Sequence, residues 1–143
     1  MKNYTLSRGE MTRLSKDPGE LAEDIAADVY QGYSAFTNAE WYDLQKESGA
    51  IGEVKSTATR LESGSKGRFR LWKDQHTRLS RADRNGSARY VFVLFDVSSR
   101  PVTASLVQRR PAKIGRVIGG RGGFSPTVHP SGPEHKLPYA AVV

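Results

Sequence analysis

The chain has 143 residues, enough for one domain with a real core but too few for two substantial ones. It contains no cysteine, so disulfides, thiolate metal sites and cysteine nucleophiles are excluded. The net charge of +7 is unevenly spread, because residues 1–64 carry 7 Lys/Arg against 11 Asp/Glu, whereas residues 65–143 carry 15 against 4.

The basic second half indicates a polyanionic partner, since each contact with a phosphate releases condensed counterions. A solubilising surface charge would give the same composition. No window is apolar enough to span a bilayer, and the first residues, MKNYTLSRGEMTR, lack the apolar segment of a secretion signal. We therefore expect a cytoplasmic protein without membrane contact.

The first clear element is a helix of roughly 13 residues in KDPGELAEDIAADVYQG. Asp17 is placed to cap it, Pro18 suits its first position, and Glu20 completes a capping box. Apolar residues recur at four-residue spacing across 21–29, and Gly32 ends the pattern.

A β-hairpin is expected next, with one strand in EWYDLQK and the other in AIGEVKSTATRL. Asp43 and Glu53 each lie five residues from Ser48, so a turn centred there places the two carboxylates opposite one another. Residues i and i+2 of a strand point to the same side, so Lys55 projects beside Glu53. The same register has Trp41 facing Lys55.

A Gly/Ser-rich loop, LESGSKGR, leads to the next elements. The segment FRLWKDQHTRLSRADRNG predicts a helix that Asn85-Gly86 ends, with one face formed by Leu71, Trp72, Gln75 and Leu79. We expect Phe69 and Trp72 in the core. ARYVFVLFDVSS is the most apolar run and predicts a central strand, and VTASLVQ predicts a further one.

The last part of the chain differs in composition. Residues 108–143 hold five of the seven prolines, six of the 14 glycines, and six Lys/Arg against a single acid. We predict a core over 1–107 followed by a basic, Pro/Gly-rich and partly irregular segment over 108–143. Candidate phosphate contacts, which could equally be solvated bases, are Lys66, Arg68, Arg109, Arg110, Lys113, Arg116 and Arg121.

The facing carboxylates of the hairpin carry the chemical signal. Two carboxylates on one face repel each other unless a cation lies between them. Oxygen ligands without nearby Cys or His favour a hard ion, and Mg²⁺ typically takes one or two protein carboxylates. A lysine beside them could orient an attacking water or neutralise transition-state charge. The pattern indicates phosphodiester hydrolysis, although solvated acids paired only with Lys55 would look the same.

The order of a helix with acids, Asp43, Glu53-Val54-Lys55 and a helix bearing Gln75 resembles the PD-(D/E)xK nuclease superfamily. That superfamily includes restriction enzymes and Holliday junction resolvases, and residues 68–97 are most similar to the resolvase branch. The resemblance covers roughly residues 17–97 and departs at Tyr42, where the family name has proline. It implies an α/β (α+β) fold with a restriction-endonuclease-like mixed central sheet flanked by helices.

Carried over to this chain, the resemblance implies that Asp43, Glu53 and the carbonyl of Val54 hold Mg²⁺, for which Mn²⁺ can substitute. Lys55 would be the catalytic cation. The motif Gly-x-x-x-Glu favours Glu23 over Glu20 as the acid contributed by the helix.

Gln75 is a further active-site candidate on the same resemblance. The implied protein is a Mg²⁺-dependent endonuclease that cuts branched or duplex DNA as a homodimer. A non-catalytic DNA-binding module on the same fold is one alternative, and a basic scaffolding protein is another.

Overall fold

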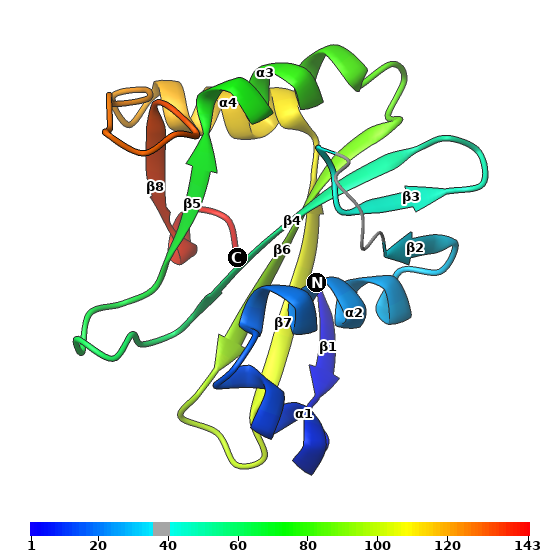
Figure 1. Ribbon diagram of the computed structural model, residues 1–143, viewed down its shortest axis with the longest axis vertical. Coiled ribbons are helices and arrows are strands. Elements are labelled where there is room, and N and C mark those ends of the chain that lie inside the picture. Colours follow the sequence, from blue (N-terminus) through cyan, green and yellow to red (C-terminus); the bar gives the residue numbers. More distant parts are fainter. Residues whose placement is uncertain (36–40) are drawn as a thin grey trace.

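The computed structural model describes residues 1–35 and 41–143 (Figure 1). None of the helices in these two ranges is long and apolar enough to cross a membrane. In chain order the elements are β1 (Lys2–Thr5), α1 (Arg8–Leu14), α2 (Pro18–Val29), β2 (Tyr33–Ala35), β3 (Leu44–Lys46), β4 (Ile51–Ala58), β5 (Arg68–Trp72), α3 (Lys73–Ala82), β6 (Ala88–Asp96), β7 (Thr103–Arg109), α4 (Pro111–Gly119), β8 (Glu134–Pro138) and the 3₁₀ helix η1 (Tyr139–Ala141).

A curled six-stranded sheet in the order β1-β7-β6-β4-β3-β2 forms the middle of the molecule. Strands β4 and β6 pair in parallel, and the other neighbours pair antiparallel. A two-stranded sheet, β5-β8, stands beside it. The expected mixed sheet flanked by helices is confirmed, with the apolar strand β6 at its centre.

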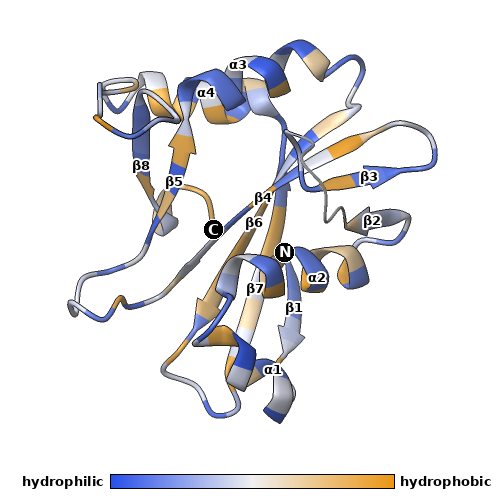
Figure 2. Cartoon of the chain, viewed as in Figure 1, coloured by the Kyte–Doolittle hydropathy of each residue, from blue (hydrophilic) through white to orange (hydrophobic). Residues whose placement is uncertain are grey.

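Helices cover both faces of the sheet, and each face has its own apolar core. On one face, Leu21 and Ile25 of α2 pack with Val91 and Val93. On the other, buried residues of α3, α4, β5 and β8 pack with β6, where Phe69 and Phe92 lie 4.8 Å apart between ring centroids. Figure 2 shows the hydrophobic colouring along β6 and β7. Burying each such large side chain stabilises the fold by about 2 kcal/mol.

Helix α2 forms as predicted, but its predicted cap does not. Asp17 is the N-cap residue, yet its side chain makes no capping hydrogen bond, and Glu20 is exposed. A complete capping box occurs instead on α1, an element that the sequence analysis did not predict. There the NH of Glu10 donates to Ser7 Oγ at 3.2 Å, and the NH of Ser7 donates to Glu10 Oε1 at 2.9 Å.

The helix predicted from residue 69 onward begins later. Residues 68–72 form β5, in which Phe69 and Leu71 are fully buried and Arg68 and Arg70 are exposed. This two-residue alternation is that of a strand, and pairing with β8 stabilises it. The prediction of Trp72 as a core residue is also wrong, because its ring stacks on His129 at the surface and is only partly buried.

The C-terminal segment is more regular than predicted. It contains α4, β8 and η1, and Ile114, Ile118 and Leu137 are buried in the second core. Pro111 at the first position of α4 and the four-residue spacing of Ile114 and Ile118 account for this helix. The segment is thus regular over these elements, whereas residues 120–133, between α4 and β8, contain no helix or strand.

Gly67 fixes the path of the chain between β4 and β5. A Cβ atom at this position would lie 1.8 Å from the carbonyl oxygen of Ala58 and 2.5 Å from Thr57 Oγ1. Both atoms belong to strand β4 or its side chains, so the backbone would have to move.

We expect Gly67→Ala to lower the free energy of unfolding by about 1–3 kcal/mol, the usual effect of overpacking. The matched control is Gly9→Ala in α1, where no atom lies within 4 Å of the added Cβ. That change should stabilise by about 0.5–1 kcal/mol, because alanine favours a helix. Urea unfolding of both variants measures the difference, and equal effects would contradict the close packing at Gly67.

Candidate active site

The hairpin of β3 and β4 has the register expected from a turn centred on residue 48. Leu44 pairs with Gly52 and Gln45 pairs with Ile51. Strand β3 begins only at Leu44, so Trp41 lies outside it. The prediction that Trp41 faces Lys55 across the strand pair is therefore wrong. Asp43 comes directly before β3, where its NH donates to the carbonyl of Gly52 at 3.1 Å.

The carboxylate of Asp43 lies against β4. Its Oδ2 accepts a hydrogen bond at 2.9 Å from the NH of Val54, the residue that follows Glu53 in the sequence. The carboxylate thereby takes the place of the backbone carbonyl that a longer β3 would have offered to this NH. Asp43 is held next to Glu53 by this bond.

Glu53 is 4% exposed and is the one charged residue that is buried as a whole, main chain included, in the described part of the chain. Its Oε1 lies 3.5 Å from Lys55 Nζ, whereas its buried Oε2 has no hydrogen-bond partner among the described residues. Burial is the main factor that raises the pKa of Glu53 well above its usual value; Lys55 lowers it and Asp43 raises it further. A buried carboxylate oxygen without a donor is unfavourable unless a cation binds it.

Lys55 and Gln75 connect the hairpin to α3. Lys55 Nζ donates to Gln75 Oε1 at 2.6 Å, and Gln75 Nε2 donates to the carbonyl of Trp41 at 3.4 Å. Gln75 belongs to the first turn of α3. The ammonium group is therefore fixed between a buried carboxylate and an amide, rather than extended into solvent.

Glu23 reaches the same place from α2. Burial and then the neighbouring carboxyl of Asp43, through a hydrogen bond and charge repulsion, raise the pKa of Glu23 to about 8. Glu20 is exposed on the same helix. The structure thus brings Glu23, Asp43, Glu53, Lys55 and Gln75 together, and it sets Glu20 apart.

The donor atoms at this site fit a hard divalent cation. The NH of Val54 points toward Asp43, and the NH and carbonyl of one strand residue share a side, so the Val54 carbonyl is directed to the same edge. Across residues 1–35 and 41–143, no three His, Asp or Glu side chains form a metal-binding group. An ion would therefore depend on Asp43, Glu53, the Val54 carbonyl and additional oxygen ligands, as is usual for Mg²⁺.

Comparison with known families agrees with this geometry. The family model described as the PD-(D/E)XK nuclease superfamily domain matches residues 10–143. The chain belongs to the PD-(D/E)XK nuclease superfamily. No curated protein and no solved structure gave a match. The family match extends through α4 and β8, so the C-terminal segment is part of the region that the PD-(D/E)XK model describes.

The basic candidates of this PD-(D/E)XK domain fall into separate places. A cleft of about 480 Å³ where β7 leads into α4 is lined by Arg89, Gln108, Arg109, Arg110, Ala112, Lys113 and Arg116. Asp83 pairs with two of these bases, at 3.1 Å from Arg110 and 3.7 Å from Arg89. Lys66, Arg68 and Arg121 do not line this cleft. Arg89 was missed because one arginine on an apolar strand carries no local signal.

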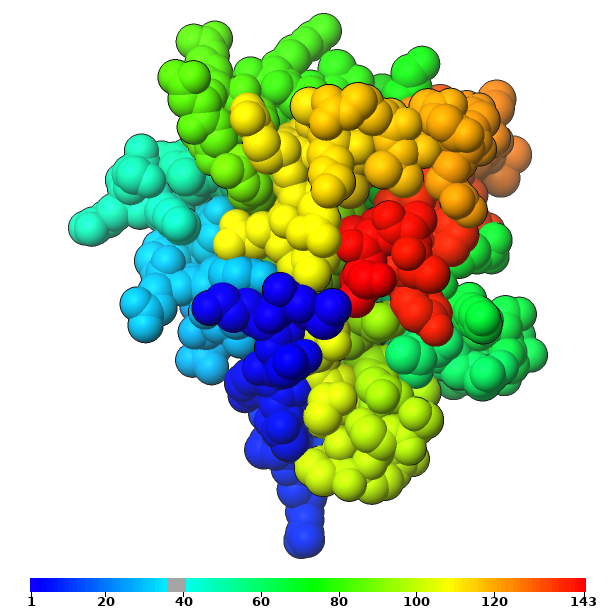
Figure 3. Space-filling model, turned by 180° about the vertical axis from the view of Figure 1, so that it is seen from behind, coloured from blue at the N-terminus to red at the C-terminus, as the bar shows by residue number. Residues whose placement is uncertain are grey.

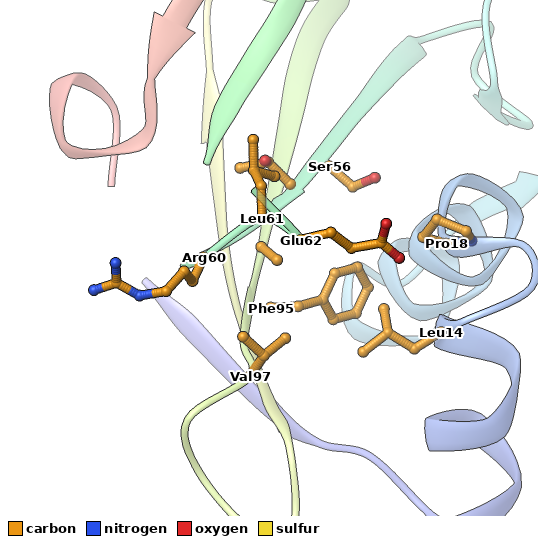
Figure 4. A pocket seen from close by; sticks show the side chains of 10 residues that line it. Leu14, Pro18, Ser56, Arg60, Leu61, Glu62, Phe95 and Val97 are labelled. Atoms are coloured by element: carbon orange, nitrogen blue, oxygen red, sulfur yellow. The ribbon is translucent and has the colours of Figure 1, made fainter. Parts of the chain in front are cut away.

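An apolar pocket of about 380 Å³ lies beyond the end of the site, between the start of α2 and the end of β4. Figure 4 shows Leu14, Phe95 and Val97 around it, with Arg60 directed away. Ser56, the residue after Lys55, is on its lining, but none of the candidate catalytic side chains is. The acidic site of this nuclease domain is therefore distinct from its apolar pocket.

The raised pKa values of Glu23 and Glu53 predict how stability depends on pH without a divalent metal. The folded state binds more protons than the unfolded chain, so the free energy of unfolding should fall as pH rises from 4.5 toward about 8. We expect Glu53→Gln to weaken this dependence. At pH near 8 in EDTA it should raise the free energy of unfolding by about 1–3 kcal/mol, because it removes a buried charge that Lys55 compensates only in part.

Thermal or urea unfolding across this pH range measures the effect. Glu47→Gln is the matched control, because Glu47 is exposed in the turn of the same hairpin. A Glu53→Gln variant less stable than the natural chain at pH 8 in EDTA would contradict the electrostatic description of the site.

Proposed function

We propose that this nuclease-superfamily chain is a Mg²⁺-dependent endonuclease that hydrolyses phosphodiester bonds in DNA. The observation that supports it most is the buried Glu53 carboxylate, whose Oε2 is without a donor among the described residues and which lies beside Asp43 and Lys55. Structural carboxylates are rarely left in this state. A bound cation would give this carboxylate oxygen the partner that it lacks among the described residues.

Each residue then has a role. Asp43, Glu53 and the Val54 carbonyl would hold the ion, which when bound polarises the phosphate and lowers the pKa of a water molecule. Lys55, fixed by Gln75, places its positive charge where negative charge develops on the phosphate. Gln75 acts as a positioning residue, because it contacts the lysine and the Trp41 carbonyl.

Glu23 contributes the acid of α2. Its raised pKa means that it holds a proton against Asp43 at neutral pH, which limits the repulsion among the carboxyl groups. With a cation bound beside Asp43, Glu23 would release this proton to solvent. Mn²⁺, with the same preference for oxygen ligands, could substitute for Mg²⁺.

The basic cleft at the end of β7 supports a nucleic-acid substrate. Arg109 pairs in register with Tyr90, which pairs with Glu53, so Arg109 lies two strands away from the acidic site, about 10 Å between backbones. Five basic side chains line the cleft, and Asp83 is the acid that pairs with two of them. Figure 3 shows β7 and α4, in yellow and orange, adjoining on the rear face. Such a surface would bind phosphates.

The finer substrate assignment rests on sequence resemblance. Residues 68–97 resemble the resolvase branch, which favours branched, Holliday junction-like DNA over plain duplex. A homodimer is proposed because symmetric cutting of two strands needs two sites. A cytoplasmic location is proposed with it.

The first experiment is a cleavage panel of single-stranded, duplex, flap and four-way-junction DNA, with and without Mg²⁺. We expect cleavage only with Mg²⁺ or Mn²⁺, and a loss of about 10²–10⁴-fold in rate for Asp43→Asn, Glu53→Gln and Lys55→Ala. Glu47→Gln should cut normally. Undiminished cleavage by Glu53→Gln or Lys55→Ala would refute the assigned site. DNA binding without turnover in either metal would instead indicate a non-catalytic binding module.

The second experiment concerns the basic cleft. We expect Lys113→Gln with Arg116→Gln to weaken duplex binding at every sequence and to reduce the slope of log affinity against log salt by about 0.9 for each lost phosphate contact. Lys16→Gln removes a positive charge from an exposed position outside the cleft and is the control. Fluorescence anisotropy at several salt concentrations measures both quantities. Equal slopes for the double variant and the natural chain would exclude this cleft as the phosphate-binding surface.

A further inference from the structure

The small β5-β8 sheet has a charged and aromatic outer face. Phe69 and Leu71 of β5 point into the core and are fully buried. The alternate residues therefore face outward, and they pair in register with residues of β8: Arg68 with Pro138, Arg70 with Lys136, and Trp72 with Glu134. In Figure 1 this sheet stands to one side of the main sheet, below α3 and α4.

Three side chains on this face form a stacked array. The guanidinium of Arg70 lies 4.4 Å from the centroid of the Trp72 ring. The ring of His129 stacks on Trp72 with centroids 4.6 Å apart and planes inclined by 29°. His129 is exposed, so the array ends in an aromatic ring at the surface.

Local hydrogen bonds hold the ring of His129 in place. The NH of His129 donates to Thr127 Oγ1 at 2.8 Å, and its Nδ1 accepts from the NH of Ser131 at 3.1 Å. The neighbouring Val128 is fully exposed, so an apolar side chain lies in solvent beside the ring. An ordered ring with an adjacent apolar group is prepared for stacking, because little conformational freedom remains to be lost.

The charge of the face is positive. Arg68, Arg70 and Lys136 are exposed, and Glu134 is the acid among the outward residues of the two strands. Glu134 is bonded to Arg70 and lies 3.9 Å from Lys136. The face therefore combines excess positive charge with an exposed aromatic ring.

The array is close to the proposed catalytic lysine. Trp72 is the N-cap residue of α3, and Gln75 follows in the first turn of that helix. Gln75 in turn accepts the hydrogen bond from Lys55. One turn of helix, roughly 5 Å along its axis, separates the aromatic array from the residue that positions the lysine.

We propose that this face binds unpaired nucleotides of the DNA substrate, with a base stacking on His129 and its phosphates meeting Lys136 and Arg68. The inference rests on the proposed function and refines its substrate class. Base stacking on aromatic rings accompanied by basic side chains is the usual way to bind single strands. The bases of a continuous duplex are stacked on one another, so they could not use the ring. The substrate would therefore have a single-stranded part.

The test compares His129→Ala with His129→Phe in EDTA, so that no cleavage is required. Fluorescence anisotropy measures affinity for oligothymidine and for a duplex of the same length. We expect His129→Ala to weaken oligothymidine binding by about 5- to 100-fold, which is the usual loss of affinity when one stacking ring is replaced by alanine. His129→Phe should retain most of the affinity, and duplex affinity should change less than twofold in either variant.

Several outcomes would overturn the proposal. Unchanged oligothymidine affinity in His129→Ala would show that the ring does not contact the strand. Equal losses on oligothymidine and duplex would assign the face to charge alone, and a loss in His129→Phe equal to that in His129→Ala would exclude stacking. Because binding is measured without metal, absence of cleavage in the panel described above leaves this result independent.

Discussion

The buried carboxylate of Glu53 is the constraint on which the other functional groups depend. Lys55 of β4, held in place by Gln75 of α3, compensates its charge, whereas Asp43 from the segment before β3 adds a second acid beside it. A carboxylate at such a position destabilises a fold unless a partner is supplied. The domain therefore keeps an electrostatically unfavourable group at a position where a purely structural sheet would have an apolar residue.

Strand β3 is short, and its early end determines where the Asp43 carboxylate meets β4. Its pairing with β4 ends at Leu44 and Gly52, so the following residues of β4 meet a side chain instead of another strand. Asp43 accepts a hydrogen bond from the backbone NH of Val54, which β3 does not reach, and a carboxylate thereby lies where the pairing of β3 with β4 ends. Sheet edges usually need protection from further pairing. Here one side chain both protects the edge and provides an acidic group.

Local sequence patterns were enough to predict the hairpin register, helix α2 and the central strand β6. Each depends on contacts within a short stretch or on a strong apolar run. The segment 68–72 was misassigned because Leu71, Trp72, Gln75 and Leu79 also fit a helical spacing, and the deciding partner, β8, lies more than 60 residues later. The helix and strand within 108–143 were not predicted, because the many glycines and prolines of this segment are typical of irregular structure. The grouping of Arg89 with Arg109 depends on pairing across β6 and β7, which no local pattern encodes.

The pairing of β5 with β8 has a consequence for biosynthesis. Strand β8 is supplied by residues 134–138, whereas the helix that follows β5 carries the amide that orients Lys55. Contacts between such distant segments form late during folding, since a long loop must first be closed. While the polypeptide is still emerging from the ribosome, α3 lacks this support. The hydrogen bond between Lys55 and Gln75 therefore gains the support of the β5-β8 sheet only after residues 134–138 have been made.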